Sequence, residues 1–352
     1  MARAGRALIG KTHRLAGLDA LRGAAATAVM IYHYTTWNST EGPGHTPPGP
    51  SVVFPYGNLG VELFFIISGF VIFMTLERTQ TLRAFAVSRI ARLYPAFLAS
   101  MAATLAVTVL LGSEPLHWDR ILASLTMAPH LFGVHAVDDV YWSLLYEVDF
   151  YILAAICVLV MGWRDPDLPC AIWLILSLAL RLSGIGQPGT IIEALTSCSF
   201  AHLFVIGIML YRLHSGHTGW RTLALLAVAV EVSLLGPAWS LNGLSGLPYM
   251  LVTAGFTALV WFGATQAGRV LARGPMRLLG WASYPLYLVH RAAGYLVLEH
   301  LEAAGVSPDA AILVTFGLAI GTACAISATV EYRGQRWIKV RLGTAGRYPQ
   351  AD

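Results

Sequence analysis

Two ionisable residues bracket an otherwise apolar stretch near the start of the chain. Arg22 and His33 enclose ten residues, GAAATAVMIY, which are typical of the middle of a membrane helix. At about 3.6 residues per turn both side chains would share one helix face, separated by about 16 Å along the axis. A guanidinium binds phosphate well, and a neutral imidazole can act as a general base. The spacing therefore indicates an elongated ligand with one anionic end and chemistry at the other.

Each of these two residues also has an ordinary explanation. Arg22 could form an ion pair with Asp19, three residues earlier on the same helix face, or extend to the membrane surface. His33 could be a hydrogen-bonded histidine at the membrane interface. Ionisable groups at membrane depth usually face an interior cavity. The shared face favours a functional site, and the ordinary explanations stay open.

Another apolar segment places two basic residues at the same membrane depth as Arg22. The segment SRIARLYP puts Arg89 and Arg92 about one helical turn apart, where two guanidinium groups can clamp one phosphate. Basic residues are also common at the cytoplasmic end of membrane helices for reasons of topology alone. We predict that these arginines bind an anion together with Arg22.

Acidic, hydroxyl and imidazole groups are expected at the level of His33. Glu62 lies in the first turn of GVELFFIISGF, and Glu147 lies about two turns into YWSLLYEVDFY, one turn beyond Ser143. His290 is about two thirds of the way along ASYPLYLVHRAAG. These residues come from different predicted helices, and their convergence at one depth is typical of a site.

The composition indicates that a bilayer surrounds these residues. The 352-residue chain is 56% hydrophobic and 12% charged, whereas soluble domains carry about 25% charged residues. Backbone groups in lipid must be satisfied internally, and the runs lack barrel-like alternation, so we predict an all-α polytopic membrane protein. About ten spans are expected, at residues 15–36, 58–76, 93–112, 141–162, 168–185, 192–212, 220–237, 246–266, 277–298 and 309–332.

The distribution of basic residues predicts the orientation. With the N-terminus inside, 19 of the 23 Lys and Arg residues fall in cytoplasmic segments, as the positive-inside rule requires. We expect both termini in the cytoplasm and a multi-pass protein of the inner (plasma) membrane without a cleavable signal. The predicted organisation is a cytoplasmic segment 1–14, a membrane domain 15–333 and a basic tail 334–352. Residues 121–133, which contain Pro129 and His130, would be interfacial or re-entrant.

The sequence shows no pattern typical of a metal site or of a nucleic-acid-binding domain. The four cysteines match no zinc or disulfide spacing and are best explained by packing; they are Cys157, Cys170, Cys198 and Cys324. No soluble basic domain is present that would bind nucleic acid. We therefore expect no metal and no nucleic-acid partner.

Five motifs follow one another over nearly the whole chain: LDALRG…H, GVELFFIISGF, RIARLYP, WSLLYEVDFY and SYPLYLVH. In this order they resemble the membrane acyltransferase-3 family of O-acyltransferases. The resemblance implies that Arg22 and His33 form the family's Arg-x10-His motif, that Arg89 and Arg92 form its cytosolic RxxR, and that Glu147 is the glutamate of its W-S-L-x-x-E motif. Departures also occur: Val148 and Asp149 follow Glu147, Arg291 follows His290, and VEYRGQRW replaces the C-terminal Glu-Arg-Pro.

The resemblance implies transfer of an acyl group, usually acetyl from acetyl-CoA, to a hydroxyl of a glycan, glycolipid or glycosylated small molecule. Acyl-CoA would be the co-substrate, with its nucleotide phosphates on the inner arginines and its pantetheine arm reaching toward His33. His33 would take the proton from the acceptor hydroxyl, and an acyl-histidine intermediate is the competing route. His290 is a further catalytic candidate.

Several residues could assist His33. Glu147 or Glu62 could hold the imidazole tautomer and stabilise the imidazolium. Ser143, Tyr146 or Tyr287 could donate a hydrogen bond to the oxyanion or to the acceptor. The alternative function is transport or flipping of a glycolipid or acylated small molecule. The sequence contains no inverted repeat or pair of broken helices that would favour a transporter.

Overall fold

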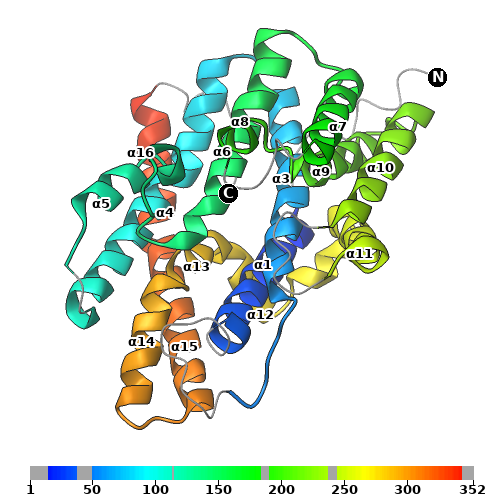
Figure 1. The fold of residues 1–352 in the computed structure, drawn as a ribbon. Coiled ribbons are helices and arrows are strands. Elements are labelled where there is room, and N and C mark those ends of the chain that lie inside the picture. Colours follow the sequence, from blue (N-terminus) through cyan, green and yellow to red (C-terminus); the bar gives the residue numbers. More distant parts are fainter. Residues whose placement is uncertain (1–14, 38–49, 113–114, 184–189, 237–243, 343–352) are drawn as a thin grey trace.

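The structure is a computed structural model that describes residues 15–37, 50–112, 115–183, 190–236 and 244–342. The predicted N-terminal segment 1–14 and the last ten residues of the predicted tail lie outside these ranges. The described residues form helices and no strand, which confirms the all-α prediction (Figure 1).

The described chain contains long helices joined by short helical turns. The α-helices are α1 (Ala16–Tyr32), α3 (Gly60–Arg78), α4 (Leu82–Leu111), α5 (Trp118–Ser124), α6 (Trp142–Ala155), α7 (Asp167–Leu182), α8 (Ile191–Thr196), α9 (Ala201–His214), α10 (Trp220–Val232), α11 (Gly246–Ala264), α12 (Pro275–Trp281), α13 (Ser283–Val289), α14 (Ala292–Ala303), α15 (Pro308–Ile326) and α16 (Tyr332–Arg341). Figure 1 shows α1 and α3 near the centre, with α7, α10 and α11 on one side and α4 and α14–α16 on the other.

Three of the helices continue through a π-helical turn. These turns are η1 (His33–Trp37) after α1, η5 (Ile156–Val160) after α6, and η8 (Ser327–Glu331) between α15 and α16. Such turns are rare and are frequently found at functional sites. One of them begins at His33, the residue predicted to be the base.

In the part of the chain that the structure describes, five helical stretches are long and apolar enough to cross a membrane: Gly57–Arg78, Leu82–Leu111, Asp139–Val160, Gly246–Ala264 and Pro308–Arg341. The other predicted spans coincide with shorter or interrupted helices. The run 192–212 is divided into α8 and α9 by Ser197, whose φ is 48°. The run 277–298 is divided among α12, α13 and α14. The chain is thus a helical membrane protein, while its ten spans and its orientation stay predictions.

Glycines bring the central helices into backbone contact. A Cβ added to Gly207 in α9 would overlap the carbonyl oxygen of Ile66 in α3, and one added to Gly69 would overlap that of Phe204. A Cβ on Gly23 in α1 would lie 2.5 Å from the backbone nitrogen of Gly280 in α12. Small residues permit such close approach between membrane helices. The helices that carry the candidate site residues are therefore held at fixed positions.

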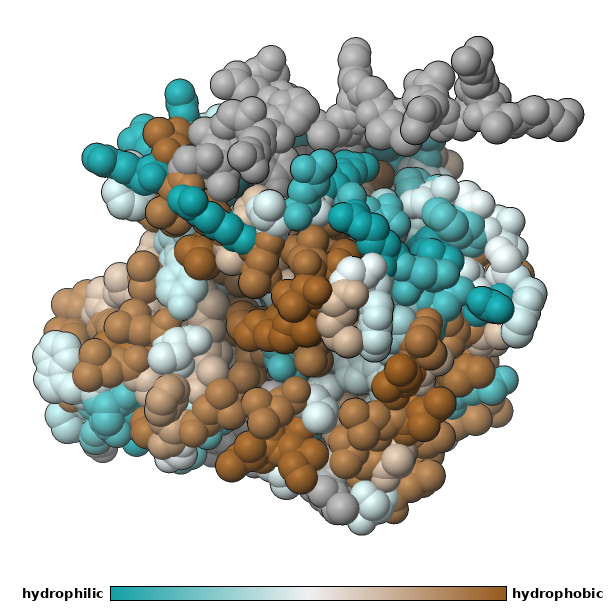
Figure 2. Space-filling view, turned by 90° about the horizontal axis from the view of Figure 1, so that it is seen from above, coloured by the Kyte–Doolittle hydropathy of each residue, from teal (hydrophilic) through white to brown (hydrophobic). Residues whose placement is uncertain are grey.

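The outer surface is largely apolar. Large side chains are exposed on the peripheral helices, among them Ile175 (68%), Leu251 (59%) and Leu313 (73%). Figure 2 shows apolar side chains over much of one face, with the hydrophilic residues gathered in a band. Exposed apolar surface of this extent is typical of a protein embedded in lipid.

Candidate active site

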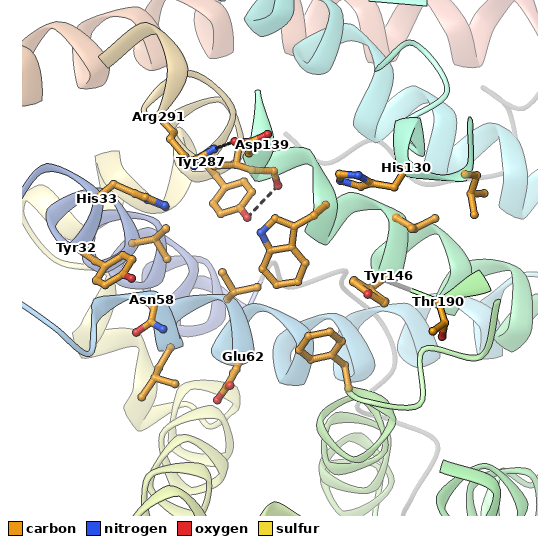
Figure 3. Close-up of a pocket in the computed structure, with 18 of the residues that line it drawn as sticks. Tyr32, His33, Asn58, Glu62, His130, Asp139, Tyr146, Thr190, Tyr287 and Arg291 are labelled. Carbon is orange, nitrogen blue, oxygen red and sulfur yellow. Dashed lines mark hydrogen bonds and ion pairs between the residues drawn. The ribbon is translucent and has the colours of Figure 1, made fainter. Parts of the chain in front are cut away.

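One cavity contains His33 and is called here the His33 cavity. Its volume is about 580 Å³. Its wall is formed mainly by the ends of α1, α3, α6 and α8, by the residue before α9 and by the α13–α14 junction. The labelled residues in Figure 3 that line it are Tyr32, His33, Asn58, Glu62, His130, Asp139, Tyr146, Thr190, Tyr287 and Arg291.

The two predicted histidines meet at this cavity: His33 lines it, and His290 lies fully buried behind His33. Nδ1 of His33 lies 3.0 Å from Nε2 of His290, and Nδ1 of His290 lies 2.7 Å from the carbonyl oxygen of Tyr287. A carbonyl only accepts, so in neutral His290 the proton sits on Nδ1 and Nε2 is the acceptor. His33 must then donate from its own Nδ1. This hydrogen-bond network assigns a free lone pair to Nε2 of His33, as a general base requires.

His290 lies at the break between α13 and α14, and buried groups hold this break in place. Tyr34 donates from its hydroxyl to the backbone oxygen of His290 at 2.6 Å. Asp138 accepts hydrogen bonds from the backbone nitrogens of Ala292 (2.9 Å) and Val140 (3.2 Å). Burial raises the pKa of Asp138 to about 6, so its carboxyl is mainly ionised at neutral pH. Asp138 was not among the predicted site residues, although it stands directly before the 3-10 turn Asp139–Tyr141 and an Asp in that position is a recognisable N-cap signal.

Arg291, which departs from the family pattern, neutralises an acid at the edge of the His33 cavity. Its guanidinium lies 2.5 Å from a carboxylate oxygen of Asp139 and also lies over the ring of Tyr295. Figure 3 shows this ion pair beside Tyr287 and above the centre of the cavity.

Glu62 lines the His33 cavity but does not contact either histidine. Its side chain is buried and interacts with the hydroxyl of Tyr249 in α11. Figure 3 shows its carboxylate turned toward α11 and away from His33. Glu62 was one of two carboxylates expected to orient His33. In the structure His290, and not Glu62, contacts the imidazole of His33.

The second cavity, called here the arginine cavity, has a volume of about 190 Å³ and is lined by Arg22, Arg89 and Arg92. The sequence predicted this convergence. Arg22 also lies 3.9 Å from Asp19, so the ion pair considered as its ordinary explanation exists beside its cavity position. Arg89 lies over the rings of Phe85 and Tyr151, at 5.7 and 5.9 Å.

Glu147 lies in the arginine cavity, which corrects its predicted position at the level of His33. Its Oε1 accepts hydrogen bonds from the hydroxyl of Ser68 at 3.0 Å and from that of Tyr151. The reason is its position on α6. Ser143 and Glu147 lie about one turn apart on the face of α6 that lines the arginine cavity, whereas Tyr146 lies on the face that lines the His33 cavity.

The two cavities share part of one wall. Val61 and Tyr287 line both of them. The hydroxyls of Tyr287 and Ser143 lie 2.8 Å apart, and each also lies 3.2 Å from the backbone oxygen of Val140. One hydroxyl can therefore donate to the other, and the second can donate to Val140. Tyr146, the third predicted hydroxyl, lines the His33 cavity away from this partition (Figure 3). The hydroxyl pair thus separates the space beside the histidines from the space beside the arginines.

Within the described ranges, no group of three or more His, Cys, Asp or Glu residues could hold a metal ion. Cys170 and Cys198 are buried, and Cys157 and Cys324 are half-buried. The residues that converge are suited instead to acid–base chemistry and to binding anions.

Comparisons with known proteins agree with this arrangement. A family model described as an acyltransferase domain, that of the acyltransferase-3 family, matches residues 15–330. The chain is 26% identical over 325 residues to "Putative peptidoglycan O-acetyltransferase YrhL" of Bacillus subtilis (strain 168). The match covers 79% of this chain and only 48% of YrhL, so the chain spans about half the length of that relative.

A second relative matches over almost its full length. The chain is 28% identical over 314 residues to "Exopolysaccharide production protein ExoZ" of Rhizobium meliloti (strain 1021), which covers 84% of this chain and 95% of ExoZ. No solved structure matches. The family model covers nearly all of the described residues, including both cavities. The chain therefore belongs to the acyltransferase-3 family and is a membrane acyltransferase.

Proposed function

We propose that this protein transfers an acetyl group from cytosolic acetyl-CoA to a hydroxyl of a polysaccharide or glycolipid at the outer side of the inner (plasma) membrane. One observation carries the proposal. A cavity with a histidine base and a cavity with three arginines meet at a wall of two hydroxyl groups, Tyr287 and Ser143.

The donor would enter through the arginine cavity. Its guanidinium groups suit the phosphates of CoA, which is made in the cytosol, and the positive-inside distribution of basic residues supports a cytoplasmic position for this end. A volume of about 190 Å³ is below the roughly 300–1,000 Å³ of pockets that enclose drug-sized ligands. It suits the narrow pantetheine arm, with the thioester pointing toward Tyr287.

The acceptor would occupy the His33 cavity. This cavity is about three times larger, at about 580 Å³. Trp142, Tyr146 and Phe200 form a cluster of aromatic rings in its wall, with centroid separations of 4.8–5.8 Å. Aromatic rings combine a large apolar face with polar edges, a combination that suits sugar rings. The names of the two relatives, which mention peptidoglycan and exopolysaccharide, agree with a carbohydrate acceptor.

In the reaction, Nε2 of His33 takes the proton of the acceptor hydroxyl while its oxygen attacks the thioester carbonyl. A C–O bond forms, the C–S bond breaks, and the proton passes to the leaving thiolate to give free CoA. His290 holds the reactive tautomer of His33 as a positioning residue. Tyr287 and Ser143 lie where they can donate hydrogen bonds to the developing oxyanion. An acyl-His33 intermediate is the alternative route to the same products.

The test is acetyl transfer by the purified protein in lipid nanodiscs, with acetyl-CoA as donor and exopolysaccharide as acceptor. We expect His33→Ala to bind acetyl-CoA nearly as well as wild type and to lose at least ~10²-fold in turnover. The matched control is His300→Ala, because this histidine is exposed and bonds only its own helix at Leu296. Near wild-type transfer by His33→Ala would overturn the mechanism. Glycolipid movement without any thioester consumption would support the transporter alternative instead.

A further inference from the structure

The C-terminal helix α16 is docked against the start of α4, the helix that carries Arg89 and Arg92 (Figure 1). Gly334 permits this contact, since an added Cβ would lie 2.5 Å from Cβ of Pro95. Arg83 donates to the backbone oxygen of Leu342 at 3.3 Å, which fixes the far end of the helix. α16 therefore lies beside the part of α4 that carries Arg89 and Arg92, two of the residues that line the arginine cavity.

The docked helix carries a carboxylate to Arg92. Glu331 closes the π-helical turn η8 and forms an ion pair with Arg92. Ser327 and Gln335 donate hydrogen bonds to the same carboxylate at 3.1 and 3.3 Å. Glu331 is thereby fixed from its own helix, and it holds the guanidinium of Arg92 in place.

The same face of α16 also brings a further cation to the arginines. α16 runs antiparallel to α4, with Gly334 beside Pro95 and Leu342 beside Arg83, so the half-buried Lys339 lies roughly alongside Arg89. Nε of Arg89 is buried and has no hydrogen-bond partner among the residues that the structure describes. Lys339, Arg89 and Arg92 together carry more positive charge than the carboxylate of Glu331 neutralises, and such an excess of charge favours a bound anion.

The small volume of the arginine cavity indicates where such an anion would lie. The cavity is too small for a whole acyl-CoA molecule, so the nucleotide and its phosphates must remain outside, at the entrance. We place this entrance where α16 meets α4, because Arg89 and Arg92 line the cavity from that side. We propose that α16 forms one wall of the donor site, with Lys339 binding a phosphate of acyl-CoA together with Arg89 and Arg92.

This inference rests on the proposed function and adds a residue from the C-terminal helix to the donor site. The experiment measures binding of acetyl-CoA and of acetyl-pantetheine, which lacks the nucleotide, to the full chain in nanodiscs. We expect Lys339→Gln to weaken acetyl-CoA binding about 10- to 150-fold, as loss of a charge-assisted hydrogen bond would. Binding of acetyl-pantetheine should change by less than about 2-fold, and Lys339→Arg should restore acetyl-CoA binding.

The matched control is Arg336→Gln, which removes a basic charge from the exposed face of the same helix. It should leave both affinities within about 2-fold of wild type, and equal melting temperatures would show that neither variant unfolds α16. Unchanged acetyl-CoA binding by Lys339→Gln, or an equal loss on both donors, would overturn the role of Lys339 but would leave the proposed donor unaffected. A wild-type protein that does not prefer acetyl-CoA to acetyl-pantetheine would overturn the proposed donor as well.

Discussion

The contact between the two histidines leads to a quantitative prediction for His290. In His290→Ala, Nδ1 of His33 loses the acceptor that lies 3.0 Å away. The proton is then held on Nδ1 less strongly, and a proton on Nε2 would remove the base. His290→Gln is the conservative variant, because its amide oxygen can accept from His33 while its amide nitrogen donates to the backbone of Tyr287.

The expected magnitude follows from the burial of this contact. His290 is fully buried, and an unmade buried hydrogen bond costs about 1–3 kcal/mol. If the whole cost appears in the transition state, turnover falls about 5- to 160-fold. Because His290 lies away from the arginine cavity, KM for acetyl-CoA should stay within about 2-fold of wild type. His290→Gln should recover part of the lost turnover.

The assay is acetyl transfer by four proteins: wild type, His33→Ala, His290→Ala and the double variant. Residues that act as one unit are strongly non-additive. We therefore expect the double variant to be no slower than His33→Ala alone. A double variant whose loss equals the product of the two single losses would show that His290 acts independently of His33 and would refute the tautomer assignment.

Three further changes test the rest of the site and the fold. Arg89→Ala should weaken binding of acetyl-CoA more than that of acetyl-pantetheine; equal losses would leave this arginine only a topological role. Glu147→Ala should lower the stability in detergent by about 1–3 kcal/mol, because the Ser68 hydroxyl loses its acceptor, whereas Glu147→Gln should cost less than about 1 kcal/mol; thermal unfolding of both variants decides, and equal losses would contradict this role. Gly207→Ala should cost about 1–3 kcal/mol or prevent folding, since its Cβ would overlap the α3 backbone. Gly255→Ala is its control, with nothing within 4 Å of the added Cβ, and similar yields of the two would contradict the packing explanation.

The positions of the basic residues and of His33 along the helix axes could be predicted from the sequence, because the rise per residue of an α-helix is constant. Arg22 and His33 belong to one helix, so their separation follows from counting residues. Glu147 was misplaced by the same counting. Glu147 and its neighbour Tyr146 line different cavities, so the face of α6, which a count of depth does not give, decides which cavity a side chain enters.

The partner of His33 could not be predicted from spacing. The sequence placed His290 at the right depth, but the break between α13 and α14 determines which way its ring points. That break depends on contacts with Tyr34 and Asp138, which are far away in the sequence. Hydropathy did not reveal the division of the runs 192–212 and 277–298 either, because the residues at the breaks are mostly buried and apolar positions surround them.

The partition between the two cavities also has an electrical consequence. A membrane that stores an ion gradient loses it through any continuous water-filled path, and an enzyme with mouths on both sides risks forming one. Tyr287 and Ser143 satisfy each other at 2.8 Å and share the backbone oxygen of Val140, so these polar groups need no water between the cavities. If the two mouths open on opposite faces of the bilayer, this pair insulates one from the other. The thioester arm that displaces it would fill the same gap, so the membrane would stay sealed during turnover.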